Sequence, residues 1–338
     1  MAMVNRSDLL FMQSDPDRRE RLAKLFVLVA DRDHRTASLV QRLLYSFGFR
    51  HMDVTTNGES ALALLKTRSY DILITEWNMM PVDGVELVKA IRNARNSERL
   101  PRDIPILMLT AQADLHSVEV ARDAGITEFV AKPFSAKTMS NRIVQIIDKP
   151  RAFVESPEFV GPCRRRRREE APKGRDKREG KSGGRTSPAK LALQKQLGSV
   201  TAAEILNDKV VVEAQTDLLK AEGEFLEWAR ADIKRLEKAF RMVRQNPKNP
   251  NAREALLEAA YAIKSQAGIF GYPLGTEVAA LLVDYLRSPR VLTAKKLIVI
   301  DKHIETISVI FKEKIKENGQ GIAMDMLYSL RRLIQRVG

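Results

Sequence analysis

The chain has 338 residues, of which 44% are hydrophobic, so it is long enough for two globular domains with connecting segments. Its single cysteine, Cys163, excludes an internal disulfide framework and a cysteine-based zinc site, and is typical of a reducing compartment. No apolar run approaches the roughly 20 residues that span a bilayer, and the charges throughout residues 1–21 do not fit a secretory signal. We therefore expect a cytoplasmic protein with no membrane span.

The formal net charge of +14 is concentrated in one part of the chain. Residues 161–190 contain 12 Lys or Arg against 4 Asp or Glu, which is more than half of the positive excess. A charge of this size can indicate nucleic acid or a membrane surface as a partner, and here it sits mostly in one segment.

Residues 23–148, which follow an N-terminal extension of residues 1–22, alternate apolar runs with amphipathic stretches. This alternation is typical of a mostly parallel sheet covered by helices. The expected strands are 25–30, 53–55, 71–75, 104–110 and 127–131, and the expected helices are 36–47, 58–67, 84–93, 117–124 and 135–147. They predict an α/β domain with a flavodoxin-like, doubly wound five-stranded parallel sheet, whose functional site lies at the C-terminal ends of the strands.

Residues 149–190 have the composition of a flexible basic linker. They combine five prolines, the pair Gly183-Gly184 and clustered charges, and such a segment buries too little apolar surface to offset the entropy of ordering.

Helical periodicity dominates residues 191–338. The breaks at Asn246-Pro247, Pro273, Pro289 and Gly319 separate four or five helices joined by short connections, and residues 191–216 are expected to add a further helix. The expected helices are 217–243, 251–270, 274–288, 294–317 and 322–336. This pattern predicts an all-α antiparallel bundle.

Polar residues stand where the expected strands end. Asp31 follows the first strand, Glu76 and Asn78 follow the third, Thr110 ends the fourth and Lys132 follows the fifth. Phosphoryl transfer to a carboxylate needs a nucleophilic carboxylate, a divalent metal and a cation for the phosphoryl oxygens, and these residue types can supply all of them.

Residues 24–148 resemble the receiver domains of two-component response regulators, of the chemotaxis-regulator type. The segment from Asp71 to Gly84 and the pair Lys132-Pro133 carry the resemblance. It implies that Glu76 stands at the phosphoacceptor position, that Lys132 contacts the phosphoryl group, and that Thr110 and Phe129 form a switch pair. It also implies that Asp31, Glu76 and Asn78 form a weak Mg²⁺ site.

The sequence departs from the receiver pattern at Ala30, where the family usually has its first acidic residue, and at Glu76, where it has aspartate. Glutamate extends the carboxylate by one methylene into the space of an aspartyl phosphate, and phosphoryl transfer tolerates little displacement. Two interpretations remain open: Glu76 pairs with Lys132 and partly imitates the phosphorylated state, or it fills a degenerate acid pocket in a docking module. A rival hypothesis is a working phosphoryl carrier in which Glu76 accepts phosphate.

Residues 215–336 resemble a histidine-phosphotransfer domain through the stretch from Ala260 to Tyr272. By that resemblance Tyr261 stands at the histidine position, and Lys264 and Ser265 belong to a docking face for a receiver. A phenol with a pKa of about 10 is a poor nucleophile at neutral pH, so we expect recognition rather than phosphotransfer.

The five consecutive arginines from Arg164 to Arg168 suit a solvated tether. An alternative is a nucleic-acid-binding regulator that uses the basic arm 164–190, although the arm has no interleaved aromatic residues for base stacking.

The sequence thus predicts a non-enzymatic signalling protein of a two-component pathway, with a degenerate receiver and a pseudo-phosphotransfer bundle. The expected partners are a sensor histidine kinase and receiver or phosphotransfer proteins, with nucleic acid the less favoured choice.

Overall fold

The computed structural model describes residues 20–94, 99–111, 115–164, 188–198, 200–287, 292–316 and 321–337. The chain divides into two compact units: the first runs to Val130 and again from Ala136 to Asp217, and the second comprises residues 131–135 and the chain from Leu218 onward. Within the described ranges, no helix is both long and apolar enough to cross a membrane.

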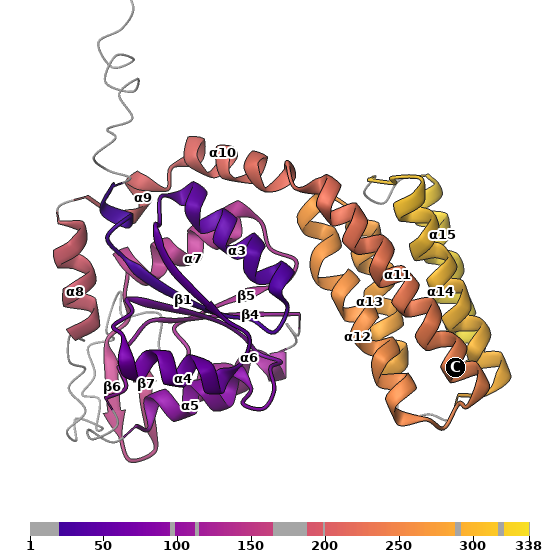
Figure 1. Ribbon diagram of the computed structural model, residues 1–338, viewed down its shortest axis with the longest axis horizontal. Coiled ribbons are helices and arrows are strands. Elements are labelled where there is room, and N and C mark those ends of the chain that lie inside the picture. The colour runs from indigo at the N-terminus through magenta and orange to yellow at the C-terminus, as the bar shows by residue number, and fades with distance from the viewer. Residues whose placement is uncertain are drawn as a thin grey trace, which may run out of the picture. The chain divides into compact units, whose positions relative to one another are not determined.

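The first unit is built on a five-stranded sheet with the strand order β2-β1-β3-β4-β5 (Figure 1). Strands β1, β2, β3 and β4 pair in parallel, as this order requires. The strands are β1 (Phe26–Ala30), β2 (His51–Thr55), β3 (Ile72–Glu76), β4 (Ile106–Thr110) and β5 (Glu128–Ala131). The predicted flavodoxin-like topology is confirmed, because consecutive β/α units that reverse direction beside β1 produce this order.

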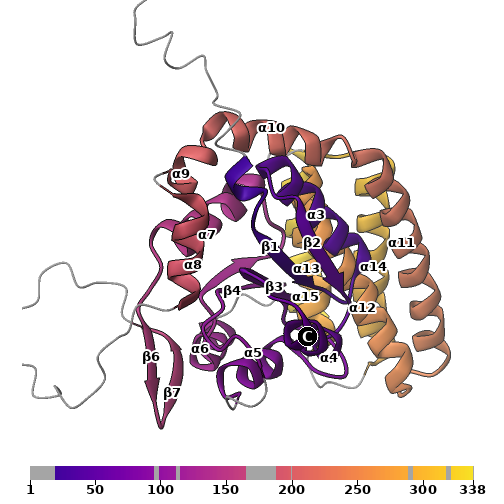
Figure 2. The same cartoon turned by 60° about the vertical axis from the view of Figure 1, so that its left-hand side comes forward.

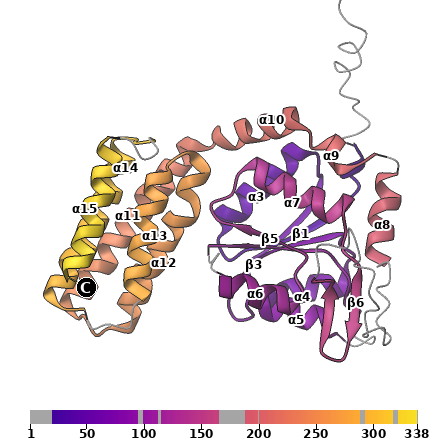
Figure 3. The same ribbon diagram turned by 180° about the vertical axis from the view of Figure 1, so that it is seen from behind.

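Helices cover both faces of the sheet, with α3 and α7 on one face and α4, α5 and α6 on the other (Figures 1 and 3). Local capping sets where they begin and end. Asp33 caps α3 and Gly48 ends it in a left-handed conformation (φ 114°), while Asp83 and Glu86 form a reciprocal capping box at the start of α5. The helices are α3 (His34–Phe47), α4 (Gly58–Thr67), α5 (Gly84–Arg92), α6 (Leu115–Ala124) and α7 (Ala136–Asp148).

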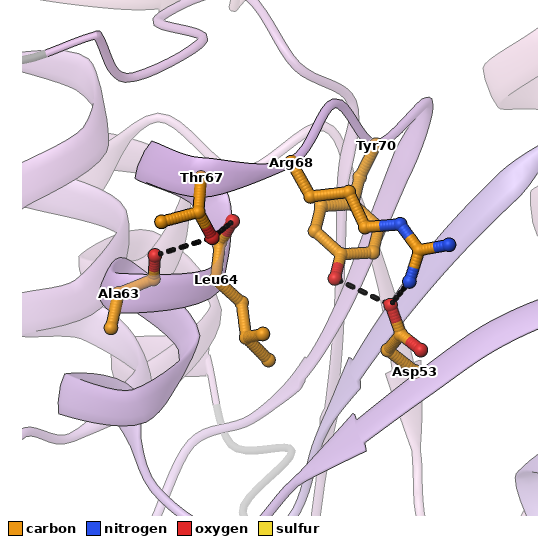
Figure 4. Close-up of polar contacts among 6 residues, drawn as sticks. All are labelled: Asp53, Ala63, Leu64, Thr67, Arg68 and Tyr70. Carbon is orange, nitrogen blue, oxygen red and sulfur yellow. Dashed lines mark hydrogen bonds and ion pairs between the residues drawn. The ribbon is translucent and has the colours of Figure 1, made fainter.

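A polar cluster lies on the edge strand β2 (Figure 4). The Asp53 carboxylate accepts a hydrogen bond from the Tyr70 hydroxyl at 2.6 Å and pairs with Arg68 at 2.6 Å. Beside it, the Thr67 hydroxyl at the end of α4 donates to helix carbonyls (Figure 4). Charged side chains of this kind discourage pairing of the open strand edge with another chain. Burial and the bond to Asp53 raise the pKa of Tyr70 to about 12.

Part of the predicted flexible linker is ordered. Residues 153–162 form an antiparallel hairpin of β6 (Phe153–Ser156) and β7 (Phe159–Pro162), so the linker prediction is wrong for residues 149–164. The remainder of the basic arm, residues 165–187, lies outside the described residues.

Tertiary contacts hold the hairpin against the rest of the first unit, and local composition does not reveal such contacts. A Cβ atom on Gly125 (φ 102°) would come within 2.8 Å of the Val160 carbonyl oxygen, so only glycine allows this close approach. Arg92, which is fully buried, donates to the Gly125 carbonyl at 2.9 Å, and its guanidinium lies 5.6 Å from the centre of the Phe153 ring. Desolvation lowers the pKa of Arg92 to about 9.

The domain boundary predicted at residue 191 also differs from the structure. The segment 188–217 belongs to the first unit, where α7 contacts both α8 and α9; Figure 2 shows these helices from a second side. The Asp148 carboxylate at the end of α7 accepts from the amides of Ala202 and Ala203 at 2.7 and 2.9 Å, and thereby holds the start of α9. The three helices are α8 (Pro188–Leu197), α9 (Ala202–Ile205) and α10 (Asp208–Leu219).

Four helices of the second unit form a closed ring, because α11 contacts α12, α12 contacts α13, α13 contacts α14 and α14 contacts α11. A fifth helix, α15, packs on α14 (Figure 3). The elements are α11 (Glu222–Gln245), α12 (Pro250–Gln266), the 3₁₀ turn η2 (Ala267–Phe270), α13 (Pro273–Arg287), α14 (Ala294–Lys312) and α15 (Ile322–Val337). The predicted all-α bundle is thus present, and it begins near residue 218 rather than 191.

An aromatic cluster closes one end of the bundle core. Phe225 stacks on Phe270 with ring centres 4.4 Å apart, and Tyr272 and Phe311 pack against Phe225 at 5.7 Å each. One buried titratable group stands out in this core: His303 is fully buried and its Nδ1 lies 2.7 Å from the Val299 carbonyl oxygen.

Candidate functional site

The sheet register brings the predicted site residues to one edge. Ala30 on β1 pairs with Thr75 on β3, and Glu76 pairs with Leu109 on β4. Asp31, Glu76 and Thr110 therefore lie at the C-terminal ends of three adjacent strands. This is the edge at which doubly wound sheets carry their sites.

The polar residues at these strand ends are buried. Relative exposure is 1% for Asp31 and Thr110, 7% for Glu76, and 6% for Lys132, which directly follows β5. Charged groups are buried only where neighbouring groups compensate them, so the strand ends hold an organised polar site rather than a set of surface residues.

The Glu76 side chain turns back onto the loop that follows β3. Its Oε1 accepts a hydrogen bond from the Trp77 amide at 2.6 Å and a longer one from the Asn78 amide at 3.3 Å. The same loop is closed by the Gly84 amide, which donates to the Trp77 carbonyl at 2.7 Å. A Cβ atom on Gly84 would lie 2.1 Å from the Glu76 carbonyl oxygen, so glycine is required there for this close approach.

The two aspartates after β1 have different tasks. Asp33 caps α3 by accepting from the Arg35 amide at 3.1 Å and from the Thr36 hydroxyl at 2.8 Å. Asp31 Oδ1 accepts from the Asp33 amide at 2.9 Å, and its side chain stays at the buried strand end. Asp33 therefore serves the helix, and Asp31 is the carboxylate that β1 contributes to the site.

A metal site assembled from these residues is poor in acids. Within the described ranges, no three His, Cys, Asp or Glu side chains gather closely enough to hold a metal ion. The oxygen donors at the strand ends are the carboxylates of Asp31 and Glu76 and the carbonyl group of Asn78. Mg²⁺ commonly binds through one or two carboxylates and keeps several waters, so this donor set fits a weak magnesium site.

The predicted switch pair lies on two neighbouring strands. Thr110 is the last residue of β4 and is buried, whereas Phe129 on β5 is half-buried and packs against the hydrophobic core beneath α5 and α6. Their roles in switching remain predictions.

Tyr261 of the second unit is half-buried on α12, and its hydroxyl oxygen is shielded from solvent. Two cations face its ring: Lys264 Nζ lies 5.7 Å and the Arg287 guanidinium 5.2 Å from the ring centre. The Ser265 hydroxyl donates to the Tyr261 carbonyl at 2.8 Å. The predicted docking residues therefore share one helix face, and Arg287, which the sequence analysis did not single out, joins them from α13.

A polar contact at the start of α7 was also missed in the sequence. Gln215 Oε1 on α10 accepts from the amide of Ala136, the first residue of α7, at 2.8 Å. Beside it, Lys137 pairs with Asp208 at 2.7 Å. No local pattern links α10 to α7, because residues 79 positions apart meet only through the fold.

Comparisons with known proteins agree on the first unit. A family profile described as the response regulator receiver domain matches residues 27–144. The chain is 32% identical over 123 residues to the chemotaxis protein CheY of Pseudomonas aeruginosa. The aligned segment covers 36% of this chain and 96% of that protein. It is likewise 32% identical over 123 residues to CheY-3 of Vibrio cholerae, with coverage of 36% and 92%.

Solved structures that resemble part of the chain include two receiver proteins. The chemotaxis response regulator CheY4 of Vibrio cholerae is 28% identical, with a TM-score of 0.32 and coverage of 35% of this chain and 98% of that one. The receiver domain of a sensor histidine kinase from Pseudomonas aeruginosa is 26% identical, with a TM-score of 0.32 and coverage of 36% and 94%; that structure holds a magnesium ion in its active-site cleft. Each of these matches covers about a third of the present chain.

Proposed function

Since the chain belongs to the response regulator receiver family, we propose that it is a two-component signalling protein whose receiver acts through protein interaction and without an aspartyl phosphate. The observation that carries the proposal is the position of the Glu76 carboxylate at the end of β3, bonded to the amides of Trp77 and Asn78.

Backbone amides pointed at one place stabilise a negatively charged oxygen. Glu76 already supplies such an oxygen to the two amides of its loop, so a phosphoryl group attached there would compete for donors that are in use. The extra methylene also moves the carboxylate away from the position that an aspartate would give it, and group transfer loses rate steeply with such displacement.

Imitation of the phosphorylated state is expected to be incomplete. A carboxylate carries one negative charge, whereas a phosphoryl group at neutral pH carries about 1.5 to 2. Glu76 would thus bias Thr110 and Phe129 towards a signalling conformation without reaching the full effect of phosphate. Mg²⁺, if bound by Asp31, Glu76 and Asn78, would neutralise charge at the strand ends.

The helical bundle is proposed to work as a recognition domain of the pseudo-phosphotransfer kind, with no enzymatic activity. The hydroxyl of Tyr261 is shielded from solvent, which argues against phosphoryl transfer through that oxygen. The cations Lys264 and Arg287 at its ring suit a partner with an acidic surface. The proposed partners are a sensor histidine kinase and receiver or phosphotransfer proteins.

Incubation with a small-molecule phosphodonor and Mg²⁺, followed by intact mass measurement, tests the proposal. The native chain is expected to gain no phosphate, whereas Glu76→Asp is expected to gain one, because only the shorter side chain restores acceptor geometry. Glu76→Asp with Lys132→Ala serves as the control that any adduct depends on the receiver site.

A phosphate adduct at Glu76 of the native chain would overturn the proposal in favour of a working phosphoryl carrier. Failure of Glu76→Asp to react, with circular dichroism showing the variant folded, would support the other interpretation, a degenerate pocket in a docking module.

A second candidate function, nucleic-acid binding, is favoured by one further surface. Arg230, Lys234, Lys238 and Arg241 are exposed along α11 at helical spacing, and among the described residues they form no ion pair. Glu227 and Glu237 lie on the same face of α11, but the four bases outnumber these two acids, and a net basic face favours an anionic partner such as a phosphate backbone.

Duplex DNA binding, followed by fluorescence anisotropy over a range of salt concentrations, tests this candidate. Replacing Lys234 and Lys238 by Gln should weaken binding and reduce the salt slope by about 2, since the slope counts the phosphates that are neutralised. The matched control replaces Lys295 and Lys312, two exposed cations of α14, by Gln. Equal losses for both double variants would assign the binding to net charge alone.

A further inference from the structure

Helix α15 stands outside the ring formed by α11 to α14 and has α14 as its principal neighbour. Leu327 and Leu330 face α14 and are 6% and 4% exposed. The other side chains of α15 from Met324 to Val337 are exposed or half-buried, so over this range the helix contacts the bundle on one side.

An apolar groove runs between α14 and α15 and has a volume of about 560 Å³. Its walls include Ile298 and Lys302 from α14 and Met326, Ser329 and Leu333 from α15. Ile298 is 54% exposed, which is high for an isoleucine beside an apolar groove. The mostly apolar lining of the groove suits the side chains of another helix.

Four α15 residues form a stripe along the groove side: Met326, Ser329, Leu333 and Val337. Their separations of three, four and four residues are those of a helix that packs along another helix. Met326, Leu333 and Val337 are half-buried within a single copy, so part of their apolar surface stays in contact with water. Ser329 is small and exposed, and would let a second backbone approach closely.

The charges of α15 are distributed unequally along its length. Its only acidic residue, Asp325, lies in the first turn, whereas Arg331, Arg332 and Arg336 lie in the second half. Asp325, Arg332 and Arg336 are separated by seven and four residues, so they follow one edge of the stripe.

We propose that this face binds a second copy of the chain, with the two α15 helices antiparallel about a two-fold axis near Ser329. That arrangement sets Met326 against Leu333 of the second copy and seats the stripe in the facing groove. It also places Asp325 beside Arg332 and Arg336 of the second copy, since residues along the same edge meet in an antiparallel pair. An axis through Ser329 repeats each of these contacts, so the surface is complementary to itself.

Charge favours the antiparallel arrangement of two copies over the parallel one. In a parallel arrangement the edges that carry Asp325, Arg332 and Arg336 would lie on opposite sides of the helix pair, so the acid of one copy would not meet the bases of the other. Only the antiparallel arrangement pairs the single acid with the bases at both ends.

Analytical ultracentrifugation of the full chain, at concentrations up to about 100 μM, tests the proposal. The native chain is expected to dimerise, and Leu333→Glu, which places a charge in the middle of the stripe, is expected to raise the dimer dissociation constant at least about tenfold. Met324→Glu is the matched control, because it adds the same charge to a residue that is 51% exposed on the opposite side of α15. A native chain that stays monomeric, or a Leu333→Glu dimer as tight as the native one, would overturn the proposal.

Charge exchange provides a readout that loss of folding cannot imitate. Asp325→Arg alone should weaken the dimer, and so should Arg332→Asp with Arg336→Asp. Each variant alone should dimerise weakly. A mixture of the two should associate again, because the basic edge of Asp325→Arg meets the acidic edge of the double variant. Native mass spectrometry should identify the mixed complex as a heterodimer. Absence of mixed dimers would rule out the antiparallel arrangement.

Discussion

The Glu76 carboxylate accepts a hydrogen bond from the Trp77 amide at 2.6 Å in the loop after β3. Glutamate is one methylene longer than aspartate, and here its side chain folds back to accept a hydrogen bond from its own loop. This bond joins Glu76, the predicted phosphoacceptor equivalent, to the only tryptophan of the first unit, so changes at the site should alter tryptophan fluorescence.

Adding an acid at the end of β1 should create a stronger magnesium site. Ala30→Asp places a third carboxylate next to Asp31, and we expect Mg²⁺ affinity to rise on the order of tenfold because ligand charge sets affinity for such hard cations. Titration of Trp77 fluorescence measures this, in a background with Trp228→Phe so that one tryptophan reports.

Ala30→Asn is the matched control for that experiment, since it adds a polar group of the same size without charge. Ala30 is fully buried, so both variants should lose stability without metal, and Mg²⁺ should restore stability in Ala30→Asp alone. Equal affinity in Ala30→Asp and the native chain would contradict the prediction of a metal site beside residue 30.

Local sequence patterns predicted the five-stranded sheet but not the hairpin. Apolar runs bounded by polar residues predict strands directly, so the positions of Asp31, Glu76 and Thr110 at one edge followed from the alternation alone. The hairpin 153–162 was missed because proline and charge dominate its surroundings, although the runs on either side of Pro157-Glu158 carry strand-forming residues. Its stability comes from Arg92 and Gly125, far away in sequence.

The contact between Gln215 and the start of α7 predicts a measurable capping energy. Gln215→Ala leaves the Ala136 amide without its acceptor, which should lower the free energy of unfolding of the first unit by about 1 kcal/mol. Urea denaturation followed by Trp77 fluorescence measures it, again with Trp228→Phe. Thr216→Ala is the control, because the Thr216 hydroxyl bonds only within its own exposed helix turn; an equal loss in both variants would assign the effect to α10 itself.

The Tyr70 hydroxyl predicts a loss of stability in alkali. Its pKa of about 12 in the folded state lies above the value of about 10 expected in the unfolded chain. The folded state therefore holds this proton more tightly, and the stabilisation is complete below pH 10 and is lost as the pH rises through 12. Tyr70→Phe should be less stable at neutral pH and should lack this component between about pH 10 and 12. Identical alkaline unfolding curves for both proteins would contradict the prediction.

His303 predicts the opposite behaviour in acid, and in the other unit. Burial lowers its pKa below the usual value of about 6.5, so the unfolded chain takes up a proton that the folded bundle rejects. Stability is therefore complete above about pH 6.5 and falls as the pH drops towards the folded-state pKa, by at most about 1.4 kcal/mol per pH unit. Urea unfolding followed by Trp228 fluorescence in a Trp77→Phe background should show this dependence. His303→Leu should remove it, because the Val299 carbonyl retains its place in the helix ladder, whereas the exposed His116→Gln should leave it unchanged. An acid dependence that survives in His303→Leu would assign the effect to other groups of the bundle.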